Sequence, residues 1–158
     1  MWHSEPGKNL TFSTVLYPTF LSPQRGFILS WIATLALHEA VAIYAAEALT
    51  IKWPNDIYHA DKKLGGILID NTVMQGTLHA SILGIGLNVN QEHFSFPGPT
   101  SLARIRRRQF DLQQLLTSIL ISLERYYLQL PTQGMAALRA QYLELLYWLH
   151  EVRTIRNA

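Results

Sequence analysis

The most informative residues of this chain lie in three short segments, KWPND at 52–56, KLGGIL at 63–68 and GIGLNVN at 84–90. They gather lysines, a carboxylate, asparagines and glycines into one region. Polar side chains and bare backbone are poor material for a hydrophobic core. The segments therefore indicate a binding site for an anionic ligand.

The composition is that of one globular domain. A chain of 158 residues can bury a sizeable core but is too short for two ordinary domains. Hydrophobic residues make up 49% and charged residues 15%, which excludes a disordered chain. Cysteine is absent, so disulfides and thiolate chemistry are excluded, and the first residues show no secretory-signal pattern. We expect a cytoplasmic protein.

Residues 27–49 form an apolar segment nearly long enough to cross a bilayer. His38, Glu39 and Glu47 interrupt it, and ionisable groups are costly in hydrocarbon. We therefore expect a buried amphipathic helix and no membrane contact. The net charge of +2 is too small to indicate nucleic-acid binding, and the arginines at 104 and 106–108 are interpreted as a solvated loop.

Local patterns predict four strands and three helices. A long helix is expected to open at Ser22-Pro23 and to end near Leu49, because serine suits an N-cap and proline a first turn. Apolar stripes with a period near 3.6 predict two later helices, one capped by Asp111 and one after Gly134. Segments rich in β-branched and aromatic residues predict strands at 10–17, 50–58, 63–70 and 77–89.

The order of these elements does not alternate regularly between strand and helix. It therefore predicts an α+β fold, with a mostly antiparallel sheet packed with helices. Prolines and a glycine at 97–99 predict a loop over 91–100, whose tip we expect near the site. The domain is expected to cover residues 1–150, and residues 151–158 to begin a further β-domain.

Strand geometry predicts a charged face. If residues 59–62 form a four-residue loop, Tyr58 pairs with Lys63 and Asp56 with Gly65. Side chains alternate along each strand, so Lys52, Asp56 and Lys63 would then project from the same face. This holds only if Pro54 inserts no bulge.

The next strand predicts a floor beside this face. Its odd positions, from Leu83 to Val89, are apolar, whereas its even positions include Gly84, Gly86 and Asn88. Glycines inside a strand often mark a place where a ligand or another backbone comes close. A pocket for a flat ring and an anion would use a lysine as electrophile, with an acidic residue to bind Mg²⁺ or orient an amine. A bulge at Gly65-Gly66 and a packing contact at Gly84 and Gly86 remain the alternative.

Other kinds of site find no support. The six histidines show no pair at zinc-ligand spacing, and no nucleophile elbow accompanies the serines. Gly84-Ile85-Gly86 lacks the third glycine and the helix of a dinucleotide fingerprint.

In order and spacing, the three segments resemble the central motifs of the catalytic domain of biotin protein ligases. The resemblance extends to residues 2–13, where Trp-x-Ser-x-Pro-Gly-x-Asn-Leu is similar to a strand of that family. It implies an α+β sandwich related to class II aminoacyl-tRNA synthetases. It also implies that biotin and MgATP form biotinyl-5′-adenylate, which then biotinylates a lysine of a biotin carboxyl carrier domain.

The resemblance implies roles for the segment residues. Lys63 would contact the biotin carboxylate and the α-phosphate, and Asp56 would orient the acceptor lysine. Asn55 and Asp56 would help hold Mg²⁺ and phosphates. The remaining ligand-binding positions are implied to be Lys52, Gly65, Gly66, Gly84, Gly86 and Asn88, with Trp2 beside the adenylate.

The chain also departs from the family pattern. The glycine- and arginine-rich loop expected before Trp2 and the C-terminal β-domain are not in the sequence. We therefore expect a catalytic domain truncated at both ends, with impaired activity. The alternative is a non-catalytic remnant that binds a nucleotide or a partner. The KWPND segment disfavours a lipoate ligase. Dimerisation through a sheet edge remains open.

Overall fold

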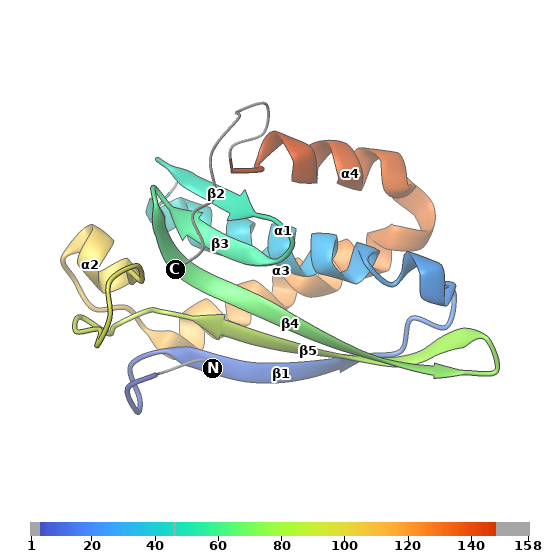
Figure 1. Ribbon diagram of the computed structural model, residues 1–158, viewed down its shortest axis with the longest axis horizontal. Coiled ribbons are helices and arrows are strands. Elements are labelled where there is room, and N and C mark those ends of the chain that lie inside the picture. The colour runs from blue at the N-terminus through green and yellow to red at the C-terminus, as the bar shows by residue number, and fades with distance from the viewer. Residues whose placement is uncertain (1–3, 46, 148–158) are drawn as a thin grey trace.

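A computed structural model describes residues 4–45 and 47–147. Five antiparallel strands form one sheet in the order β1-β5-β4-β3-β2, and helices α1 and α3 cover one of its faces (Figure 1). This confirms the predicted fold class. The strands are β1 (Leu10–Leu16), β2 (Leu49–Lys52), β3 (Asp56–His59), β4 (Lys62–Met74) and β5 (Thr77–Leu87). The helices are η1 (Pro23–Arg25), α1 (Ile28–Ala45), α2 (Leu102–Arg106), α3 (Leu112–Gln133) and α4 (Met135–Glu144).

Helix α1 is the centre of the core. Most of its side chains are buried against the sheet and α3, which confirms a buried helix. By length and composition alone, Pro23–Ala45 is the one described helical stretch that could cross a membrane, and most of it is buried inside the protein. The predicted bounds were wrong. Pro23 opens a short 3-10 turn instead, and α1 ends before Ala48, whose positive φ of 64° turns the chain into β2.

Residues 50–58 are a hairpin, not the single predicted strand. Strand β2 ends at Lys52, residues 53–55 make the turn, and β3 begins at Asp56. Proline has no N–H to donate to a ladder, so Pro54 interrupts the strand. The turn places Lys52 directly across from Asp56 in the register of the pair.

Strands β4 and β5 extend beyond their neighbours as a two-stranded ribbon (Figure 1). Gln75 and Gly76 form its turn with φ values of 48° and 78°, which suit a tight hairpin. The predicted alternation on β5 is confirmed, because Leu83, Ile85 and Leu87 are buried on the helix side.

The second half of the chain is helical, as predicted. Asp111 caps α3 by accepting hydrogen bonds from the backbone of Gln113 and Gln114, and Gly134 separates α3 from α4. The arginine cluster is not a loop. Ser101 caps α2, which carries Arg104 and Arg106, and Arg107 ends it with a left-handed backbone.

After α4, the chain covers the free edge of β2. Ile51 donates its N–H to the carbonyl of Leu145, and Tyr147 donates to the carbonyl of Ile51, at 2.8 and 2.7 Å. The predicted domain boundary at 150 and the strand at 151–156 lie outside the described residues.

His38 on α1 makes stability dependent on pH. Burial lowers its pKa from 6.5 despite opposing contributions from the Leu49 backbone and Glu39, and its Nε2 has no hydrogen-bond partner among the described residues. Below pH 6.5 the unfolded chain therefore binds a proton more readily than the folded one, so the free energy of unfolding falls with falling pH until the lower folded pKa is passed. Urea unfolding between pH 7.5 and 5.5 should show this loss, and His38→Leu should reduce it. If the free energy of unfolding depends on pH in the same way in both proteins, His38 is not the group responsible.

Candidate functional site

The centre of the site is an ion pair between Lys63 on β4 and Asp56 on β3. The Lys63 ammonium lies 2.7 Å from Asp56 Oδ1, and the two side chains are 36% and 26% exposed. Tyr58 pairs with Lys63 as predicted, but Asp56 pairs with Gly66 rather than Gly65. The ladder has a β-bulge there, with the fully buried Leu64 as the residue lacking a partner on β3.

Gly66 makes room for this ion pair. A Cβ at Gly66 would lie 2.6 Å from Asp56 Oδ1 and 3.2 Å from Lys63 Nζ. The Lys63 and Asp56 side chains thus lie over the bare backbone of Gly66. The glycine is needed there for the charged pair as well as for any ligand.

Gly65 serves packing instead. A Cβ there would lie 2.9 Å from the carbonyl oxygen of Gly86 and 3.2 Å from Leu87 Cδ1. Gly65 is thus in close backbone contact with Gly86, whereas the bulged residue is Leu64 and not the Gly65-Gly66 pair of the alternative. The implied role in ligand binding is not supported by its position.

Gly65→Ala should destabilise the fold by about 1–3 kcal/mol, because backbone atoms of the sheet must move to admit the methyl group. The measurement is urea unfolding at pH 7.5. Gly84→Ala is the matched control, because a Cβ at Gly84 meets no atom closer than 3.7 Å. Equal stability of the two variants would contradict the packing role.

A shallow pocket lies over the glycine floor. It holds about 330 Å³ between β1, β5, β4 and the ion pair. Gly84 and Gly86 form the base as predicted, and Ile67 and Leu68 add apolar surface. The other lining residues are Thr11, Phe12, Ser13, Asp56, Lys63, Gly66 and Ile85.

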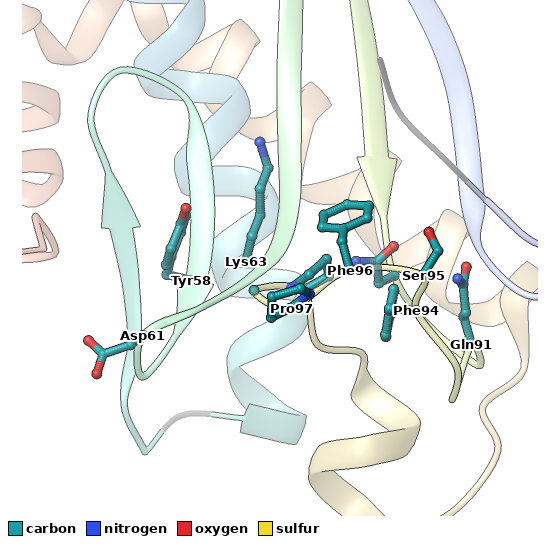
Figure 2. A pocket seen from close by; sticks show the side chains of 11 residues that line it. Tyr58, Asp61, Lys63, Gln91, Phe94, Ser95, Phe96 and Pro97 are labelled. Atoms are coloured by element: carbon teal, nitrogen blue, oxygen red, sulfur yellow. The ribbon is translucent and has the colours of Figure 1, made fainter. Parts of the chain in front are cut away.

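A second pocket of about 400 Å³ lies under the loop 91–100. The predicted approach of this loop to the site is confirmed. Figure 2 shows the Lys63 side chain with Tyr58 on one side and Phe96 of the loop on the other. The backbone of Lys63 holds the loop, since its N–H donates to Gly98 and its carbonyl accepts from Thr100, both at 2.9 Å. Lys63 thus lines both pockets.

Asn88 reaches the loop pocket from the end of β5. Asn88 is only 3% exposed. Its backbone is fixed by hydrogen bonds with Leu64 and Leu102. Asn88 lines the pocket, and its side chain carries an amide. This amide can therefore donate to and accept from a ligand.

Lys52 is held beside the site and outside both pockets. Its ammonium lies 3.5 Å from the Tyr58 hydroxyl and 5.0 Å from the centre of that ring. The predicted common face of Lys52, Asp56 and Lys63 is confirmed by the register. Lys52 adds positive charge at the rim of the site.

Asn55 fixes the turn to the sheet. Its Nδ2 donates to the Ile67 carbonyl at 2.5 Å, and its own carbonyl accepts from the Ile67 N–H at 3.0 Å. Residues 4–45 and 47–147 contain no group of three or more His, Asp or Glu side chains that could hold a metal ion. Asp56 is the carboxylate that pairs with Lys63. Trp2 lies outside the described residues.

The sequence pointed to Lys63 and Asn88 in the loop pocket, but not to the aromatic residues of its loop wall. Phe94 and Phe96 come from an irregular segment, and Gln91 supports the loop base by accepting from Asn9 Nδ2 and donating to His93. The sequence signal that could have indicated this wall is the presence of aromatic residues in a proline- and glycine-rich loop.

Solved structures of biotin protein ligases share this fold. The enzyme from Aquifex aeolicus in complex with biotin and ATP superposes with a TM-score of 0.78 at 23% identity, covering 90% of this chain and 60% of that one. The enzyme from Leishmania major in complex with biotinyl-5-AMP gives 0.75 at 20% identity, covering 96% and 66%. The architecture therefore defines a protein with the biotin protein ligase fold.

The sequence assigns the family directly. Residues 1–88, more than half of the chain, match the model of the biotin/lipoate A/B protein ligase family. This chain belongs to that family, which confirms the resemblance of its three segments.

Two relatives show how much of a full-length ligase this chain covers. The bifunctional ligase/repressor BirA of Bacillus subtilis is 31% identical over 144 residues, covering 88% of this chain and 44% of the relative. The biotin–[acetyl-CoA-carboxylase] ligase of Paracoccus denitrificans is 31% identical over 135 residues, covering 78% and 56%. The chain thus spans about half the length of these relatives.

Proposed function

We propose that this protein activates biotin with ATP and transfers it to a lysine of a biotin carboxyl carrier protein. The observation that carries the proposal is the position of Lys63, which lines both pockets and pairs with Asp56. Two ligands bound in these pockets would meet at this ammonium. Membership of the ligase family supports the same reaction.

In the first step, biotin would lie on the glycine floor and the nucleotide under the loop. A carboxylate oxygen of biotin attacks the α-phosphorus of ATP, the bond to the β-phosphate oxygen breaks, and pyrophosphate leaves. Both reactants carry negative charge, so the Lys63 ammonium stabilises the transition state electrostatically. Phe94, Phe96 and the Asn88 amide would bind the flat base.

In the second step, the amine of the acceptor lysine attacks the carbonyl carbon of the adenylate. The amide bond forms, the bond to the phosphate oxygen breaks, and AMP leaves. The attacking amine must lose a proton, and the Asp56 carboxylate is the acceptor nearest to Lys63. Asp56 would orient this amine while it holds Lys63 in place.

Magnesium fits this site as an ion held mainly by the nucleotide. Asp56 Oδ1 is engaged by Lys63, and Asp56 Oδ2 is the remaining carboxylate oxygen. One carboxylate with phosphate oxygens and water is a common magnesium environment. Bound Mg²⁺ would neutralise phosphate charge. The amide of Asn55 is committed through its nitrogen to the turn, which leaves its oxygen as a second donor.

The purified chain should catalyse biotin-dependent exchange of pyrophosphate into ATP and add biotin to an apo carrier domain, detected by mass spectrometry. Exchange without transfer would restrict the activity to adenylation. Tight binding of biotinyl-adenylate in calorimetry without exchange would favour the non-catalytic alternative and refute the activity.

We also propose that two copies can associate through β4. Strand β3 pairs only with the first part of β4. From Leu68 to Met74, β4 pairs with β5 on one edge and has no strand partner among the described residues on the other. Leu68, Val73 and Met74 are exposed there, and an open apolar edge favours pairing with another strand. Analytical ultracentrifugation should detect a dimer that Thr72→Pro abolishes; a monomer at all concentrations would exclude it.

A further inference from the structure

The loop 91–100 has a second hollow on its outer side. This groove of about 430 Å³ is lined by Lys62, Arg104 and the loop residues 94–99. The loop residues 94–99 line both this groove and the loop pocket. Lys62 precedes Lys63 on β4, so their side chains point to opposite faces of the strand.

The groove carries positive charge without a carboxylate in its lining. Lys62 and Arg104 are both exposed, and the Arg104 guanidinium lies 5.7 Å from the centre of the Phe94 ring. Neither cation belongs to the two ion pairs found in residues 4–45 and 47–147, which are Lys63–Asp56 and Arg125–Glu39.

The nearest acidic groups by sequence are engaged elsewhere. Asp61 accepts a hydrogen bond from the Tyr147 hydroxyl and lines the other pocket, and Glu92 accepts one from Gln109. A groove with two cations and no compensating carboxylate favours an anionic partner.

We propose that this basic groove binds a carboxylate-bearing segment of the acceptor protein. The inference rests on the proposed function, because the acceptor must present its lysine amine to the Lys63–Asp56 pair. Backbone hydrogen bonds tie the loop wall to Lys63, so a segment lying in the groove is held beside the reacting centre. Charge complementarity would speed the encounter and set the orientation of the acceptor.

The test measures biotin transfer to an apo carrier domain at low salt, with the acceptor concentration varied. Lys62→Glu, alone and with Arg104→Glu, should raise the KM for the acceptor, by about tenfold in the double variant. The KM values for ATP and biotin and the rate of pyrophosphate exchange should stay at wild-type values. The difference should shrink as salt screens the charges. The matched control is Arg25→Glu with Arg139→Glu, two exposed arginines outside the groove.

An unchanged KM for the acceptor would overturn the inference. A raised KM for ATP would overturn it as well, because the groove would then hold nucleotide phosphates. If the wild-type chain shows no exchange, the proposed function fails separately, and calorimetry with the apo carrier domain then decides the inference. Binding that Lys62→Glu weakens would support the groove, whereas equal binding or none would refute it.

Discussion

Replacing Lys63 by methionine should lower the rate of biotinyl-adenylate formation by about 10²–10³-fold, because the ammonium that faces both pockets is lost. Methionine keeps much of the length of the side chain and removes its charge. The measurement is biotin-dependent pyrophosphate exchange with ATP at saturating substrate. The fold should persist, since Lys63 holds the loop through its backbone.

Lys8→Met is the matched control for this variant. Lys8 is an exposed lysine that lines none of the described pockets, so exchange should proceed at the wild-type rate. Wild-type exchange by Lys63→Met would rule out the electrostatic role of Lys63 and with it the proposed mechanism.

Gly66→Ala should reduce the same rate by about a hundredfold while leaving the fold nearly as stable as the wild type. The added methyl group would press on the ends of the Asp56 and Lys63 side chains, which can move aside without disturbing the core. Misplacing a reacting group by about 1 Å can cost this much in rate. Exchange kinetics and urea unfolding, measured together, check both parts of the expectation.

The neighbouring glycine gives the opposite expectation, which makes the pair informative. Gly65→Ala presses on backbone atoms and should lower stability, whereas Gly66→Ala presses on the charged pair and should lower activity. If Gly66→Ala unfolds the protein and leaves the specific activity of the folded fraction unchanged, the role assigned to Gly66 is wrong.

Much of the charged face could be predicted because strands alternate with a fixed period. The four-residue loop expected at 59–62 is wrong, because His59 pairs with Lys62 and the chain turns at Ala60 and Asp61. The shorter turn keeps Tyr58 opposite Lys63, so the common face of Lys52, Asp56 and Lys63 is still formed. The predicted partner of Asp56 was wrong by one residue, because the bulge depends on burial of Leu64 and leaves no local sequence signal.

The fold class was predictable, whereas some element bounds were not. Pro54 was recognised as a source of irregularity, but whether it bulges or ends a strand depends on Asn55, which ties the turn to β4. The loop pocket was harder to foresee in detail, because its walls come from residues far apart in the chain. Its position is decided by backbone hydrogen bonds from Lys63 to Gly98 and from Thr100 to Lys63, and no periodic pattern encodes these.

The main chain and the side chain of Lys63 have different roles. Backbone groups hold the loop, and the ammonium faces Asp56 and the two pockets. Side-chain substitutions at this position therefore leave the loop anchor chemically intact. The loop residues 94–97 can in turn be exchanged without touching the atoms that attach it. Under the proposed mechanism, base recognition and charge stabilisation are thus separable, so each can be altered by substitution while the other serves as the internal reference.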